Sequence, residues 1–301
     1  METDGMKFLK RAVLPIVISI ILLIVLLSVP GGSSLKVARS TPSSSVNQSY
    51  DFNANMSVSV AFNFGTLKKN NINITLGASG AVNPANSSAQ ADVSIGGIPR
   101  FGSTKSSTIS AQLVLVGSTI YVKSDLLGNG QWKSKDISSI VKGLNGAIAA
   151  DFSPETLLST LGTLGSVTKG SSSVDGGVAV TSYLVNVDLK KLLAKVSLGS
   201  AIPCIPDATI PVNLLVDGNG YVRHLGVSYN LSSLIPKKIS TYLKISAVLN
   251  LSVDFSNFGA PVVITAPNAT PMGETGLGKS HSLPPKQSLR VPFSGAGICG
   301  S

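Results

Sequence analysis

The chain has 301 residues, of which 13% are charged and 5% aromatic, and its mean hydropathy is +0.35, a combination that excludes a disordered chain. The formal net charge is +10, but the 24 Lys and Arg residues are sparse, and their densest runs after the N-terminal segment are isolated pairs at 68–69, 190–191 and 237–238. A nucleic-acid-binding protein clusters its cations along a groove or helix, so this pattern argues against a nucleic-acid partner.

The N-terminal segment indicates the compartment of the protein. Residues 1–11 carry three basic side chains and precede an apolar run at 12–29. That length reaches the lower limit of about 18 residues for spanning a bilayer, and the basic flank keeps residues 1–11 in the cytoplasm. We expect an uncleaved transmembrane anchor, with a cleaved signal or a buried core helix as alternatives. The first two place the rest of the chain outside the cytoplasm, and the anchor makes the chain a single-pass protein of the cell membrane.

Alternating apolar residues dominate the chain after a Ser/Gly/Pro-rich stretch at 30–49, which we interpret as a flexible linker. Every even residue from Phe52 to Phe64 is apolar, a period of two that predicts a strand buried on one face. Similar alternation predicts further strands at 72–78, 89–95, 109–115, 120–123 and 239–255. A strand as long as the last must bend or twist strongly, as strands do in barrels.

Two Gly-containing turns predict hairpins. Asp217-Gly218-Asn219-Gly220 separates apolar runs at 211–216 and 221–231, and a Leu-Gly-Asn-Gly sequence at 127–130 precedes Trp132.

Three amphipathic helices are predicted between the strands. Asp136 can cap the first, Ser153-Pro154 opens the second, which ends at Gly165, and Asp188 can cap the third. Each needs an apolar surface, and the sheet offers the only one. The predicted fold is therefore α+β: one strongly curved antiparallel sheet with about three helices on its concave face, preceded by the transmembrane helix. Residues 50–267 form this domain, and residues 268–301 are expected to be an irregular tail.

Motifs for catalysis or cofactor binding are weak. The segment 273–280 matches the phosphate-binding pattern GxxxxGK[ST], but Pro284-Pro285 forbid the helix that the pattern requires. His224 and His281 are the only histidines, too few for a metal site with the scattered acids. We therefore expect no enzyme activity, no metal, no cofactor and no nucleotide partner.

Seven N-x-S/T sequons occur, and the strand pattern places Asn55, Asn73 and Asn250 on polar faces. A Ser-rich composition also produces such matches by chance. The remaining sequons are at Asn47, Asn86, Asn230 and Asn268.

Cys204 and Cys299 are the only cysteines, so no cysteine directly after the apolar run is available for lipid attachment. Outside the cytoplasm the two can form one disulfide, which we expect; two unpaired buried thiols are the alternative.

Five segments, taken in order, resemble the mycobacterial LppX and LprA/LprF/LprG lipoproteins over roughly residues 50–267. They are GSTIYVKSDLLGNGQWKSKD (117–136), FSPETLLSTLGTLGSV (152–167), YLVNVDLKKLL (183–193), PVNLLVDGNGYVRHLGVSY (211–229) and SVDFSNFGAPVVITAP (252–267). The resemblance implies the LolA-like fold, a half-barrel with helices over its mouth. It also implies binding of lipids or lipidated molecules, which the family moves through the cell envelope. This chain lacks the lipidated cysteine that follows the signal in that family.

The predicted function is therefore non-catalytic binding or carriage of a lipid or acyl-chain ligand in the cell envelope, with an envelope transporter as a candidate partner. The alternative is a cell-surface structural or adhesive module with no lipid ligand, in which the helices fill the cavity. Periods of two and 3.6 select the residues expected to line the cavity. They are Val58, Val60, Phe62, Leu76, Ile109, Leu113, Leu243, Ile245 and Leu249 on the sheet, and Ile140, Val141, Leu144, Leu157 and Leu161 on the helices.

Overall fold

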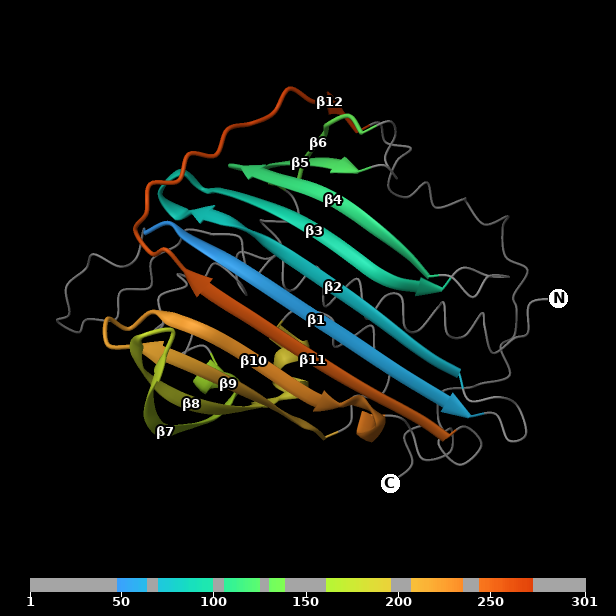
Figure 1. The fold of residues 1–301 in the computed structure, drawn as a ribbon, viewed down its shortest axis with the longest axis vertical. Coiled ribbons are helices and arrows are strands. Elements are labelled where there is room, and N and C mark those ends of the chain that lie inside the picture. The colour runs from blue at the N-terminus through green and yellow to red at the C-terminus, as the bar shows by residue number, and fades with distance from the viewer. Residues whose placement is uncertain are drawn as a thin grey trace.

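A computed structural model describes residues 48–63, 70–99, 106–124, 130–138, 161–195, 207–234 and 244–272. In these ranges twelve strands form one sheet, in the order β12-β6-β5-β4-β3-β2-β1-β11-β10-β9-β8-β7 (Figure 1). The strands are β1 Tyr50–Asn63, β2 Asn70–Asn83, β3 Ser88–Pro99, β4 Ser106–Val116, β5 Thr119–Ser124, β6 Lys133–Asp136, β7 Gly165–Asp175, β8 Val178–Asp188, β9 Thr209–Asp217, β10 Val222–Asn230, β11 Lys244–Ser256 and β12 Thr270–Pro271.

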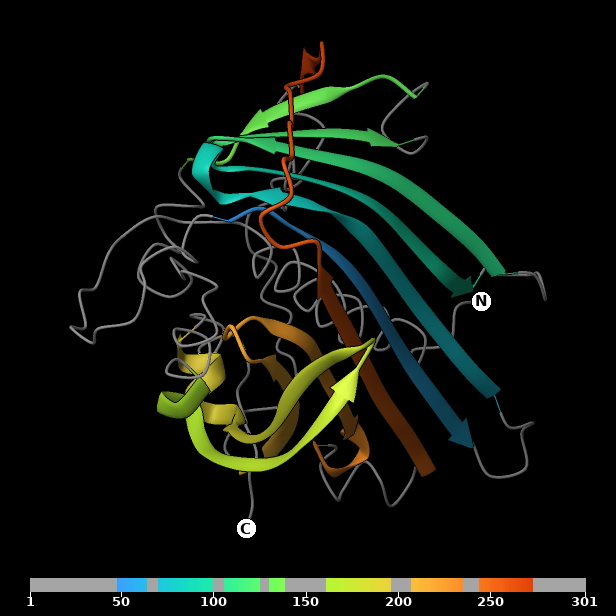
Figure 2. The same cartoon turned by 60° about the vertical axis from the view of Figure 1, so that its left-hand side comes forward.

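The predicted curved antiparallel sheet is confirmed. Every pair of neighbouring strands in this sheet is antiparallel except β12 and β6, which are parallel. Figure 2 shows that the sheet curves along its width, so that the β7–β8 hairpin turns back toward the side that the curve encloses. Both predicted hairpins are present, because β9 pairs with β10 and β5 pairs with β6.

The alternation of the sequence becomes the two faces of this sheet. In β1, Phe52, Ala54 and Met56 are buried, whereas Asn53 and Asn55 between them are exposed. The same parity continues into the neighbours, since Met56 is paired with Leu76 of β2 and with Leu251 of β11. We call the apolar side the inner face and the polar side the outer face.

Two hydrophobic clusters cover the inner face. The first cluster lies on β1, β2 and β11 and has Met56 and Val58 among its buried members. The second cluster lies on β8 and β9 around Leu214 and includes Leu164. Phe255 packs against both clusters, so the core is continuous across the sheet. Burial raises the pKa of the Tyr50 phenol far above its usual value, because the first cluster excludes water from it.

The described helices are short. Helix α4 spans Leu189–Lys195, and the Asp188 carboxylate accepts hydrogen bonds from the backbone N–H groups of Lys190 and Lys191, which confirms the predicted cap. Residues 161–164 are helical, and the helix ends before Gly165, as predicted; β7 follows directly. Most of the helix predicted after Asp136 lies outside the described residues. The 3-10 turns η1 Pro84–Asn86 and η4 Leu231–Leu234 complete the regular structure of the described residues.

Two parts of the sheet differ from the expectation. The sequence analysis assigned no strand to β7, which is Ser/Gly-rich, and none to β8. Almost all of β7 is exposed on both faces, so it has no apolar alternation to detect. The tail expected to be irregular from residue 268 begins with β12, which pairs with β6 through the backbone. Two residues, one of them Pro271, are too short for a periodic signal.

Several predicted features lie outside the described residues: the anchor at 12–29, the linker up to residue 47, the phosphate-loop match at 273–280, and both Cys204 and Cys299. Among the described residues, no helix combines the length and the apolar character that crossing a bilayer would require.

Gly80 provides a test of the sheet's tight pairing. A Cβ atom at this position would lie 1.9 Å from the backbone carbonyl oxygen of Gln90, which cannot move without shifting β3. We expect Gly80→Ala to lower the free energy of unfolding by about 3 kcal/mol, the upper end of the usual cost of overpacking. Gly77→Ala is the matched control in the same strand, because its Cβ would meet only side-chain atoms, the Ser94 hydroxyl at 3.0 Å and Asn55 Oδ1 at 3.8 Å. Equal urea midpoints for the two variants would contradict this account.

Candidate functional site

The inner face is built from rows of apolar side chains that run across the strands. Residues paired in adjacent strands point to the same face, so the register defines each row. One row crosses eight strands from β8 to β4 without a polar residue: Val185, Val212, Val227, Leu251, Met56, Leu76, Ile95 and Ile109. Such a row gives the inner face a continuous apolar floor.

Neighbouring rows extend this floor in both directions. Val58 is paired with Leu249 and Ile74, and Val60 is paired with Ala247 and Ile72. On the other side the rows contain Ala and Gly residues, whose short side chains rise less above the sheet. These rows are Val253, Ala54, Ala78, Val93 and Ala111, and then Phe255, Phe52, Gly80, Ala91, Leu113 and Val122.

The cover over this floor is uneven. At the centre, Met56 and Leu76 are 2% and 3% exposed. Toward β3, β4 and β5 the same rows become half-buried, although their side chains stay apolar. We define the half-covered apolar patch as Ala91, Val93, Ile95, Ile109, Ala111, Leu113 and Val122. An apolar surface that remains partly open to solvent is the feature expected of a binding site for another apolar molecule.

The sequence candidates on the sheet share this face as far as the structure describes them. Val58, Leu76 and Leu249 are buried in the first cluster, and Val60 packs against it half-buried. Ile109 and Leu113 belong to the half-covered apolar patch. Phe62 and Ile245 are paired in the register that continues the same rows.

The helical candidates are placed less completely. Leu161 packs against the second cluster, under β8 and β9, and not beside the patch. Leu243, Ile140, Val141, Leu144 and Leu157 lie outside the described residues. The sequence analysis omitted Ala91, Val93, Ile95, Ala111 and Val122 from the candidates, although alternation at 89–95 and 109–115 placed most of them on an apolar face.

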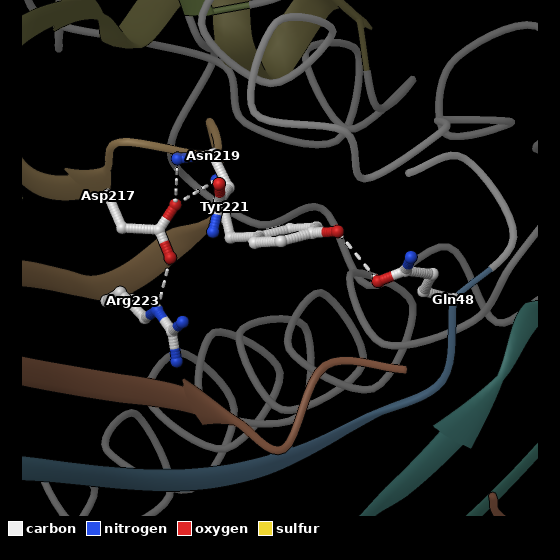
Figure 3. Close-up of polar contacts among 5 residues, drawn as sticks. All are labelled: Gln48, Asp217, Asn219, Tyr221 and Arg223. Atoms are coloured by element: carbon white, nitrogen blue, oxygen red, sulfur yellow. Dashed lines mark hydrogen bonds and ion pairs between the residues drawn. The ribbon is translucent and has the colours of Figure 1, made fainter. Parts of the chain in front are cut away.

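A polar cluster closes the β9–β10 turn (Figure 3). The buried Asp217 carboxylate accepts backbone hydrogen bonds from Asn219 and Tyr221 at 2.9 Å each, and its other oxygen accepts one from Arg223 Nε at 2.7 Å. The Tyr221 hydroxyl donates to Gln48 Oε1 at 2.7 Å. These contacts join the turn to the segment that leads into β1.

Phe258 completes this cluster after β11. Its ring stacks on Tyr221 with centroids 4.4 Å apart, and the Arg223 guanidinium lies 4.8 Å from the ring centroid. Because the polar groups bind one another and the turn backbone, we interpret the cluster as stabilising the β9–β10 turn and not as a catalytic centre.

His224 contacts Asp254 on the outer face. Its Nδ1 lies 2.7 Å from Asp254 Oδ1, an arrangement that orients the ring as in acid–base sites. Its other ring nitrogen, Nε2, faces Gly226, since a Cβ atom built on Gly226 would lie 3.0 Å from it. Because glycine has no side chain, this neighbour supplies no nucleophile. No three His, Cys, Asp or Glu residues of the described ranges gather as a metal-binding group.

No family model matches the sequence, and no curated protein matches it. The structure is similar to the lipoprotein LppX of Mycobacterium tuberculosis, with 13% identity, a TM-score of 0.37, and coverage of 70% of this chain and 89% of that chain. It is also similar to LprF of Mycobacterium bovis, with 15% identity, a TM-score of 0.38, and 71% and 89% coverage. A LolA superfamily protein of Nitrosomonas europaea matches with 8% identity, a TM-score of 0.17, and 72% and 88% coverage. The two mycobacterial proteins belong to the group that the five sequence segments resemble.

Proposed function

We propose that the domain is a non-catalytic binder or carrier of a lipid or acyl-chain ligand in the cell envelope, held at the membrane by residues 12–29. The observation that carries this proposal is the half-covered apolar patch. It extends the apolar floor of the inner face beyond the part that the chain itself buries.

The energetics favour an acyl chain as the occupant. Burying an acyl chain in an apolar site gains about 0.8 kcal/mol per CH₂, so a chain of ordinary length binds without specific polar contacts. Ala91 and Ala111 are short side chains in the same rows as Leu113 and Val93, so we expect a flexible chain to fit along these rows. A polar or charged ligand would gain nothing from this surface.

Lipid analysis of the purified protein tests the proposal. The full chain is taken from native membranes, and its bound lipid is quantified by native mass spectrometry and solvent extraction. We expect Ile109→Asp to lower the bound lipid per protein at least tenfold, because a carboxylate in the patch must lose its hydration when the ligand binds.

Thr108→Asp is the matched control, because Thr108 is the adjacent, exposed residue on the outer face and should leave the lipid content unchanged. Ala111→Trp is a second variant that keeps the patch apolar but fills its space. Circular dichroism checks that each variant is folded. If folded Ile109→Asp and Ala111→Trp proteins carry as much lipid as wild type, or wild type carries none, a structural or adhesive module replaces the carrier.

A further inference from the structure

Two apolar rows of the inner face end in cations at β6. The register places Lys133 beside Val122 of β5, and Lys135 beside Ile120. Because paired residues of adjacent strands point to the same face, both lysines lie on the inner face. The row of Lys133 runs through the half-covered apolar patch. From β3 to β6 the two rows are Ala91, Leu113, Val122 and Lys133, and Ala89, Leu115, Ile120 and Lys135.

The two ammonium groups are not paired with carboxylates. Lys133 is half-buried, and its Nζ donates a hydrogen bond to the Thr270 hydroxyl at 2.8 Å, which uses one of its three N–H donors. Lys135 is exposed. The ion pairs among the described residues include neither lysine. The aliphatic stem of a lysine lies along apolar surface while its ammonium stays in water, so both charges are available at the rim of the patch.

The inner face around these lysines carries no opposing charge in the part of the chain that the structure describes. The aspartates of β1, β3, β6 and β11 lie on the outer face, because each follows a residue that points inward. They are Asp51, Asp92, Asp136 and Asp254. Strands β2, β4 and β5 contain no acidic residue. The positive charge at β6 is therefore not neutralised on this face.

Protection of a sheet edge does not explain Lys133. Edge strands often carry lysines that discourage pairing with another chain. However, β6 has β12 on its other side, where Lys133 is paired with Thr270 (Figure 1). The placement of this lysine at the end of an apolar row therefore calls for another explanation.

A molecule that fits both surfaces has apolar chains and an anionic group at one end. Phosphate oxygens accept charge-assisted hydrogen bonds from ammonium groups. Adjacent strands are about 4.8 Å apart, so the rows from β3 to β6 span about 14 Å, and chains that lie on the patch can begin at a headgroup bound at β6. A neutral lipid gains nothing from the lysines, and a free phosphate gains nothing from the apolar rows.

We propose that the ligand is an anionic lipid, whose phosphate headgroup is bound by Lys133 and Lys135 while its acyl chains lie along the rows toward β3. This inference rests on the proposed function, since the headgroup reaches these lysines when the chains occupy the half-covered apolar patch. The headgroup stays at the solvent-exposed rim and keeps part of its hydration. The lysines therefore select the class of lipid, while the chains supply most of the affinity.

Titration of the full chain with two lipids that share their acyl chains tests this inference. The chain is freed of copurified lipid in detergent micelles and titrated with phosphatidylglycerol or with diacylglycerol, and bound lipid is counted by native mass spectrometry. We expect wild type to bind phosphatidylglycerol about fivefold more tightly or better, as one or two water-exposed ion pairs allow. The double variant Lys133→Gln/Lys135→Gln should lose this preference and still bind diacylglycerol.

Three further variants separate charge from structure. Lys133→Arg/Lys135→Arg keeps both charges and should keep the preference. Lys123→Gln is the matched control, because Lys123 lies on the neighbouring strand β5 but is paired with Gln112 on the outer face. Lys135→Gln alone leaves the bond between Lys133 and Thr270 in place and should still weaken the preference. Lipid bound by the basic residues at 1–11 is common to all variants, so it cancels from the comparison.

An equal preference for phosphatidylglycerol in wild type and in the double Gln variant would overturn the inference but keep the carrier. If the lipid-free chain binds inorganic phosphate through these lysines and does not distinguish the two lipids, the site takes a free anion and the inference is also overturned. If wild type binds neither lipid, the proposed function fails as well.

Discussion

Replacing Asp217 by alanine is expected to lower the free energy of unfolding by about 3–5 kcal/mol, the cost of breaking a buried ion pair on one side. The Asp217 side chain is 1% exposed, so the Arg223 guanidinium loses a partner that water replaces poorly. The backbone N–H groups of Asn219 and Tyr221 lose their acceptor in the same substitution. The turn that joins β9 to β10 therefore loses three bonds at once.

Two further variants separate these contributions in urea unfolding. Asp217→Asn keeps an oxygen for the two N–H groups but removes the charge, so we expect an intermediate loss. Asp254→Ala removes a carboxylate that is also paired, with His224, but is 58% exposed, and should cost less than about 1 kcal/mol. Similar losses of unfolding free energy for Asp217→Ala and Asp254→Ala would show that the buried cluster does not stabilise the turn.

Leu214→Ala is expected to cost about 2–5 kcal/mol, because it opens a cavity at a fully buried position. Leu214 is 0% exposed and lies in the second cluster, which also contains Leu164 and is contacted by Leu192 of α4. Leu215→Ala is the matched control, since Leu215 is the next residue, faces the opposite side and is half-buried. Urea unfolding should separate the two variants by more than about 1 kcal/mol. Equal losses would mean that the second cluster packs loosely.

The elements that sequence predicts best are those whose stabilisation is local. The alternation at 52–64 gave both the strand and its buried face, because a half-buried strand needs an apolar residue at every second position. Asp188 predicted the start of α4, and the Asp-Gly-Asn-Gly sequence at 217–220 predicted the β9–β10 turn, because each motif satisfies backbone groups within a few residues.

Other features depend on contacts that no local pattern encodes. β7 is a strand because β8 lies beside it, and its own exposed residues carry no periodic signal. The pairing of β1 with β11 was not predicted, since alternation gives a strand without naming its partner. For the candidate site, alternation placed the sheet candidates on the apolar face of the sheet, where the structure has those that it describes. It could not predict that Met56 is buried while Ile109, in the same row, remains half-buried, because alternation indicates which face a residue lies on and not how deeply that face is buried.

The pairing of β1 with β11 has a consequence for how the protein is made. The two strands form the middle of the sheet, and the contact between Asp51 and Asn257 joins residues 206 positions apart. Long-range pairing of this kind makes folding slow, because the loop must close before the contacts form. As the chain is synthesised, β1 and β2 emerge early and one edge of β1 stays unpaired until β11 follows. A newly made chain therefore needs protection from aggregation until β11 arrives.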